Sequence, residues 1–158
     1  MKKAFHVIAL IAFCLIGIQN IQAQTFKGTL SNVSMNDKTY NNVNDVTFTL
    51  TKKNGDNYIL TSSPIGPIGK MPGTINVNAS IIVNEKGHIS TNSVDEFAGT
   101  LDLKLGGSLN IYMTNITGRN EGDSINFVLD TYSLDILEIL GIEAIRASVT
   151  FNGTKVSN

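Results

Sequence analysis

Few residues in this chain are suited to acid–base or nucleophilic chemistry. His88 is the only histidine beyond the first 23 residues, and it follows Gly87 in what reads as a turn. A lone histidine in a turn is usually solvated, and no serine–histidine–aspartate arrangement is indicated around it. The single cysteine, Cys14, falls in an apolar leader that we expect to be removed. We therefore predict no thiol nucleophile and no disulfide in the mature chain.

Paired carboxylates offer another route to catalysis, because two of them at a suitable separation can act as acid and base. Asp95 and Glu96 are adjacent, yet neighbouring side chains in a strand point to opposite faces. Asp130 and Asp135 flank a segment that reads either as a short helix or as a strand. Four other carboxylates could offer loop oxygens to calcium but lack a regular calcium-loop spacing: Asp37, Asp45, Glu121 and Asp123. We predict no catalytic residue, no metal site, no cofactor and no enzymatic activity.

The charge of the chain bears on its partners. It holds 12 Lys and Arg residues and 13 Asp and Glu residues, and loss of Lys2 and Lys3 with the leader leaves 10 basic residues and a net charge of −3. No basic run or stripe is present. Nucleic acid is therefore excluded as a predicted partner.

The first 23 residues read as a signal peptide. Residues 1–3 are positively charged, residues 7–18 form an apolar run, and Ala23 supplies a small residue at the cleavage position. A membrane anchor is the alternative, but the apolar run is short for crossing a bilayer. We predict an exported protein, periplasmic or extracellular, with no integral membrane span in its mature chain.

Alternation of apolar and polar residues dominates the rest of the chain, and it is typical of strands with one buried face. Turn signals separate the alternating runs; the clearest is Asn54-Gly55, which suits a tight hairpin. Short strands at this spacing predict an antiparallel sandwich or barrel. The alternating runs cover residues 46–51, 75–81, 97–105, 109–113, 125–130 and 145–151.

Two segments depart from this rhythm. Residues 64–73 hold all three prolines of the chain, which excludes an inner strand there. Residues 134–140 read as a short helix capped by Ser133 and ended by Gly141, or nearly as well as a continuing apolar strand.

A Phe-x-Gly-Thr repeat favours a barrel over a sandwich. It occurs as "FKGT" from Phe26, "FAGT" from Phe97 and "FNGT" from Phe151. Phe, Gly and the following apolar residue would share the inner face, and an inward glycine permits the sharp coiling that barrel closure needs. One copy opens the mature chain and another nearly ends it, as expected where the first and last strands are neighbours. We predict one all-β domain over residues 25–156: an antiparallel up-and-down β-barrel of eight to ten strands.

The chain resembles the calycin-like β-barrel domain family of secreted bacterial envelope proteins. The resemblance covers about residues 25–155 and rests on the order of "FKGTL", "VTFTLTKKNGDNYIL", "IGKMPGTINV", "FAGTLDLKLGG" and "ASVTFNGTK". It implies a shape akin to that of lipocalins. The chain contains no tryptophan, so it lacks the lipocalin Gly-x-Trp signature, and the resemblance does not imply lipocalin ligand chemistry.

A barrel in the outer membrane is disfavoured by the polar face of the strands. Lys and Arg at the middle of a bilayer cost about 2–4 kcal/mol each. The face opposite the predicted core carries Lys27, Asn76, Asn78, Asp102, Lys104, Asn110 and Arg146.

The barrel interior is the remaining candidate for a binding site. A small barrel is either filled by side chains or holds one small ligand. Our main hypothesis is a noncatalytic binding module for a small apolar or lipid-like ligand; the alternative is a structural or interaction protein of the bacterial envelope with a filled barrel. Ile65, Ile68 and Met71 of the proline-rich loop could act as a lid, contact a partner, or simply cap the barrel end. The predicted ligand-lining residues are Phe48, Tyr58, Leu60, Leu103, Ile111, Met113 and Phe127.

Overall fold

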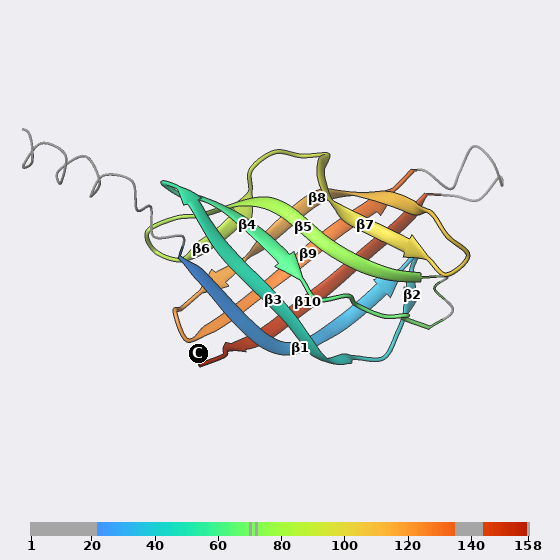
Figure 1. The fold of residues 1–158 in the computed structure, drawn as a ribbon, viewed down its shortest axis with the longest axis horizontal. Helices are drawn as coiled ribbons and strands as arrows, with labels where there is room; N and C mark the ends of the chain where they lie inside the picture. Colours follow the sequence, from blue (N-terminus) through green and yellow to red (C-terminus); the bar gives the residue numbers. More distant parts are fainter. Residues whose placement is uncertain (1–21, 70, 72, 135–143, 158) are drawn as a thin grey trace, which may run out of the picture.

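The computed structural model describes residues 22–69, 71, 73–134 and 144–157, and all of its regular elements in these ranges are β-strands (Figure 1). The strands are β1 Ala23–Met35, β2 Lys38–Thr39, β3 Val43–Asn54, β4 Asn57–Ser62, β5 Gly73–Val83, β6 His88–Thr91, β7 Glu96–Leu103, β8 Ser108–Asn120, β9 Ser124–Ser133 and β10 Ile145–Lys155. The predicted all-β class is confirmed. Residues 134–140 lie outside the described residues except for Leu134, and so does the predicted leader except for Gln22 and Ala23.

The strands form one closed antiparallel barrel. Each pairs with its neighbour along the chain in the order β1, β3, β4, β5, then β8, β9 and β10, and β10 pairs with β1 to close the ring. The short strands β6 and β7 share one position, because each pairs with a different stretch of both β5 and β8. Eight positions therefore make up the ring, and β2 is an extra strand on β1. The predicted up-and-down barrel of eight to ten strands is confirmed.

Glycines lie where the ring closes. Gly28 of the first Phe-x-Gly-Thr copy is directly opposite Gly153 of the last copy in the β1–β10 pairing. A methyl group built on Gly28 would lie 2.0 Å from the Asn152 carbonyl oxygen and 2.6 Å from the Gly153 Cα. The two backbones thus approach more closely than any larger residue at position 28 permits.

The middle copy of the repeat behaves differently from our prediction. A register shift between Phe97 and Gly99 in the β7–β8 pairing marks a β-bulge. Phe97 is 43% exposed, whereas Ala98 is 1% exposed and takes the inward place. The prediction that Phe97 shares the inner face with Gly99 and Leu101 is therefore wrong, because the extra residue reverses the alternation at that point.

Four phenylalanines fill one half of the interior. They come from the strands that flank the closing seam: Phe26 on β1, Phe48 on β3, Phe127 on β9 and Phe151 on β10. Each is at most 1% exposed. The Phe48 ring centroid lies 4.7 Å from that of Phe151 and 5.1 Å from that of Phe127. Burying a phenylalanine contributes about 1.5–3 kcal/mol, so this cluster is a main source of stability across the seam.

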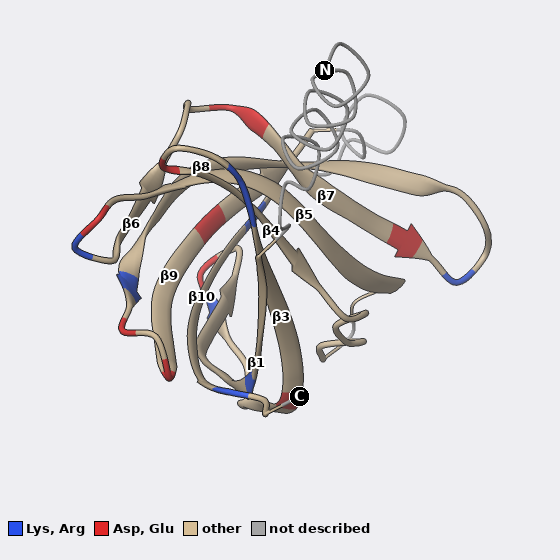
Figure 2. Ribbon diagram, turned by 60° about the vertical axis from the view of Figure 1, so that its left-hand side comes forward, with Lys and Arg blue, Asp and Glu red and all other residues tan. Residues whose placement is uncertain are grey.

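Charged residues lie in many separate places on the barrel, as Figure 2 shows for Lys and Arg in blue and Asp and Glu in red. Among the described residues, the only ion pair is the exposed contact between Lys27 and Asp45, at 2.9 Å. An exposed pair of this kind contributes little to stability. The fold is therefore held by its interior packing and its strand pairing.

Replacing Gly28 with alanine tests the closing seam. We expect Gly28→Ala to lower the free energy of unfolding by about 1–3 kcal/mol, because the new methyl group overlaps the β10 backbone. Urea unfolding followed by circular dichroism measures this. Gly55→Asn is the control: position 55 has open space and a φ of 50°, which asparagine tolerates. Equal stability of Gly28→Ala and the wild type would contradict the prediction.

Candidate functional site

The two ends of the barrel differ. The end we call the hairpin end carries the β3–β4, β5–β6 and β8–β9 turns. The end we call the loop end carries β2, the β7–β8 turn, and the connection of residues 63–72 between β4 and β5 (Figure 1).

The proline-rich connection turns inward at the loop end. Ile65, Ile68 and Met71 are 4%, 5% and 7% exposed and belong to the hydrophobic core. Ile65 exchanges two backbone hydrogen bonds with Ile75 of β5, both 2.8 Å long. The loop also packs on the Tyr40 ring through Gly69. The three apolar side chains therefore plug the loop end, which combines the lid and cap positions considered from the sequence.

Two apolar cavities lie behind this plug. One has a volume of about 40 Å³ and touches Ile65 and Ile68; the other has about 30 Å³ and touches Met71. Both are bounded by four shared residues, so they adjoin, and we call them together the loop-end chamber: the shared residues are Ile75, Ile111, Thr131 and Ala147. These volumes are far below the roughly 300–1,000 Å³ of ordinary ligand pockets.

One polar atom in the chamber lacks a partner. Ser133, the last residue of β9, is 3% exposed, and its Oγ makes no hydrogen bond with the described residues. It lines the smaller cavity beside Thr131. A buried hydroxyl without a partner costs about 1–3 kcal/mol, so a water or a polar ligand atom at this place would be favourable.

The predicted lining residues divide between chamber and core. Phe48 and Ile111 line the chamber. Leu60, Met113 and Phe127 are buried without lining it, and Leu103 packs against the core. Tyr58 lies at the hairpin end, where it lines an open exterior depression and its ring centroid is 5.8 Å from the Lys52 Nζ. Two of the seven predicted residues therefore border the chamber and five do not.

Several chamber residues were not predicted as lining. Ala98 and Ala147 are small, Thr131 and Ser133 are polar, and our prediction selected large apolar side chains. The alternation Ile125, Phe127, Leu129 continues through positions 131 and 133, and it could have placed both hydroxyls inward. The sequence left Ser133 open as a helix cap or as part of a continuing strand, and the structure places it as the last residue of β9.

The residues considered for acid–base chemistry lie apart from the chamber. His88 is exposed on β6, with its Nε2 3.1 Å from the Arg119 Nη2. The Glu96 carboxylate accepts hydrogen bonds from Asn92 and Ser93. Among the described residues, no three His, Cys, Asp or Glu side chains gather as metal ligands. In the same part of the chain, no helix has the length and hydropathy needed to cross a membrane.

Asp102 ties three strands together at the loop end. Its carboxylate accepts hydrogen bonds from Ser108 at 2.7 Å and from Asn76 of β5 at 2.6 Å. The bond from Ser108, followed by one from Thr100, lowers the pKa of Asp102 below its ordinary value of 3.8. Asp102 also lies opposite Thr74, next to the point where the plug enters β5.

The fold defines the class of protein: an all-β protein with a closed antiparallel barrel of eight strand positions. This agrees with the shape that a resemblance to calycin-like domains implies. Comparison of the chain with family models, with curated proteins and with solved structures found no match. Membership of the calycin-like family therefore stays a prediction.

The lowered pKa of Asp102 gives a pH-dependent contribution to stability. A carboxyl whose folded-state pKa lies below its unfolded value stabilises the fold above the unfolded pKa, and this contribution is lost as the pH falls through the folded pKa. We expect Asp102→Asn to be less stable than the wild type at neutral pH, with a difference that shrinks below pH 3.8. Urea unfolding at several pH values measures this. A difference that stays constant throughout the acid range would contradict the assignment.

Proposed function

We propose that the protein is an exported, noncatalytic binding module that takes a small apolar or lipid-like ligand in the loop-end chamber. The observation that carries the proposal is an apolar chamber that contains a hydroxyl without a partner and is closed by the side chains of a loop. Ile65, Ile68 and Met71 occupy the positions that an apolar ligand would fill.

The size of the chamber decides how a ligand would enter. Cavities of about 40 Å³ and 30 Å³ have room for little more than a few methylene groups. A lipid-like chain therefore needs the plug to move outward, which frees the volume of three large side chains. Two hydrogen bonds between Ile65 and Ile75 join the start of the plug to β5, and Met71 bonds back to Ile68 within the loop itself. Outward movement would thus break few bonds to the barrel.

The chamber supports binding of an apolar chain with a small polar head. Leu30, Ile75, Val77 and Val149 offer methyl groups, and Phe48, a member of the phenylalanine cluster, bounds the chamber on the side of that cluster. The Ser133 Oγ would meet a carboxyl or hydroxyl group at the edge of this apolar surface. Binding would satisfy the buried hydroxyl and replace the plug contacts with equivalent apolar contacts.

A filled barrel with a structural or interaction role in the envelope is the second candidate. The packed phenylalanine half favours it, because no cavity separates Phe48, Phe127 and Phe151, whose rings touch. In that case the chamber is a packing defect, and no ligand would enter it. The two candidates therefore make different predictions. A binding module should lose its affinity for an apolar ligand when the chamber is filled, whereas a filled barrel should bind no such ligand at all.

Ala147→Val tests the chamber as a binding site. Position 147 borders both cavities, and two added methyl groups occupy a large part of them. We expect the free energy of unfolding of the variant to be about 0.5–2 kcal/mol higher than that of the wild type, because the added methyl groups fill a cavity. We also expect the variant to bind dodecanoic acid at least about tenfold more weakly. Calorimetric titration of lipid-free protein measures the affinity.

Thr154→Val is the matched control for this experiment, because position 154 is exposed on the same strand and receives the same residue. We expect it to bind dodecanoic acid as the wild type does. The chamber proposal would be refuted, and the filled barrel favoured, if Ala147→Val is more stable than the wild type but neither the wild type nor either variant binds dodecanoic acid.

Export is tested separately by the mass of the protein recovered from its own cells. We expect cleavage after Ala23, so that the mature chain begins at Gln24 and appears outside the cytoplasm. Cleavage there would remove the backbone bond from the Lys52 amide to the Gln22 carbonyl and leave the pairing of Gln24 with Leu50 in place. Intact-mass measurement of fractionated cells decides this, and uncleaved protein in the cytoplasm would contradict it.

A further inference from the structure

An aromatic row crosses the outer face of the barrel. Phe97 of β7 is paired with Tyr112 of β8, Tyr112 with Tyr132 of β9, and Tyr132 with Arg146 of β10. Tyr112 lies between the buried Ile111 and Met113, so it faces outward. The row therefore places three rings and one guanidinium group side by side on the surface of four consecutive strands.

The rings of this row are held in place. The Tyr112 and Tyr132 centroids are 5.6 Å apart with an angle of 29° between the rings, which is a stacked arrangement. Desolvation, followed by the effect of the nearby Asp95 carboxylate, raises the pKa of Tyr132. Both tyrosines remain partly exposed, and Phe97 is 43% exposed. Fixed, partly exposed rings of this kind offer flat apolar surfaces to a ligand.

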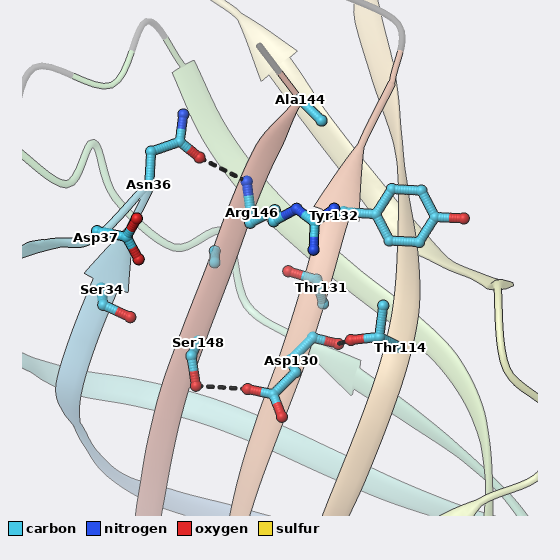
Figure 3. A pocket seen from close by; sticks show the side chains of 11 residues that line it. Ser34, Asn36, Asp37, Thr114, Asp130, Thr131, Tyr132, Ala144, Arg146 and Ser148 are labelled. Carbon is cyan, nitrogen blue, oxygen red and sulfur yellow. Dashed lines mark hydrogen bonds between the residues drawn. The ribbon is translucent and has the colours of Figure 1, made fainter.

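A polar groove adjoins the row. It has a volume of about 570 Å³, is open to solvent, and runs over the outer face of β9 and β10 to the turn between β1 and β2 (Figure 3). This volume is within the range of ordinary ligand pockets and exceeds that of the loop-end chamber. Its lining consists of Ser34, Asn36, Asp37, Thr114, Asp130, Thr131, Tyr132, Ala144, Arg146, Ala147 and Ser148.

Hydrogen bonds fix the rim and floor of the groove. The backbone N–H of Asn36 donates to the backbone carbonyl of Arg146 at 3.0 Å, and the backbone N–H of Arg146 donates to the side-chain Oδ1 of Asn36 at 2.8 Å. On the floor, the Ser148 hydroxyl donates to the Asp130 Oδ1. The Asp130 Oδ2 has no hydrogen bond with the described residues, and neither has the Arg146 guanidinium group. The groove thus presents a free oxygen on the positioned Asp130 carboxylate as an acceptor and the Arg146 guanidinium group as a donor (Figure 3).

The charged residues of the groove restrict the chemical class of ligand that it can bind. Asp37 and Asp130 face one cation, Arg146, so the groove carries a slight negative charge. Nucleic acid also stacks on aromatic rings, but it needs a positively charged track for its phosphates. A neutral molecule with many hydroxyl groups needs both donors and acceptors, and its C–H groups can lie on the electron-rich faces of aromatic rings.

We propose that this outer groove, together with Tyr112, Tyr132 and Phe97, binds a neutral oligosaccharide. Sugar rings lie against the aromatic row, and their hydroxyl groups bond with Asp130, Arg146 and Asn36. The groove and the loop-end chamber share Thr131, Tyr132 and Ala147 as lining residues, but the glycan contacts proposed here are on the outer face and do not require a ligand in the chamber.

Binding to a printed array of neutral glycans tests the site with two variants. Asp130→Asn keeps an oxygen for Ser148 and replaces the free acceptor with a donor; Tyr132→Leu keeps apolar bulk and removes the flat ring. We expect the wild type to retain at least one glycan, and each variant to bind it at least about tenfold more weakly, because Asp130→Asn loses a charged acceptor and Tyr132→Leu loses a flat aromatic face. Affinities are then measured by titration with that soluble glycan.

Two controls separate this site from folding defects and from the chamber. Asp123→Asn changes an exposed carboxylate at the hairpin end, and Val77→Ile adds a methyl group to the chamber from β5, at a position that does not line the groove. Both should bind the glycan as the wild type does, and thermal unfolding should show that all variants are folded. The proposal is overturned if the wild type retains no glycan, if Asp130→Asn and Tyr132→Leu both bind normally, or if a protein partner alone is lost in these variants.

Discussion

Closure of the ring at the β1–β10 seam is the constraint on which the rest of the structure depends. Gly28 faces Gly153 there, and their lack of side chains lets two strands from opposite ends of the chain pair along most of their length. Closure leaves no long sheet edge among the described strands, and exposed edges invite aggregation. It also makes β3, β1, β10 and β9 neighbours in the ring, so that the Phe48, Phe127 and Phe151 rings pack together across the seam. The seam and its aromatic filling therefore stabilise each other.

The interior is divided because its side chains change in size along the barrel axis. Large rings fill the hairpin half, while Ala98, Ala147 and Thr131 leave space in the loop half. A barrel of eight strands has little volume to spare, so small residues at a few positions are enough to open a chamber. The connection of residues 63–72 then covers this end with apolar side chains that would otherwise be exposed. Chamber and plug are thus two results of the same distribution of side-chain volumes.

The sequence predicted the barrel well because alternation and turn signals report local geometry. Asn54-Gly55 makes a hairpin, and the outer copies of Phe-x-Gly-Thr lie at the seam, as expected from their places in the chain. The site was predicted less well, because its features depend on contacts between distant segments. The inward turn of Ile68 and Met71 depends on space left by β5 and β9. The position of Phe97 depends on a bulge, and a bulge changes the pairing with only one added residue. The inward position of Ser133 was not predicted, because a serine before an apolar segment suits a helix cap as well as the end of a strand.

The bulges that interrupted the alternation also shape the outer face. In β7, the bulge turns Phe97 outward, beside Tyr112. In β8, a second register shift between Met113 and Asn115 makes room for Thr114, which is exposed and lines the outer groove. Without these extra residues, Phe97 would point into the barrel and Thr114 would not stand beside Asp130. Bulges are enriched next to functional sites because they redirect side chains without changing the rest of a sheet. The two bulges on adjacent strands therefore account for the outward position of Phe97 in the aromatic row and for the place of Thr114 in the lining of the outer groove.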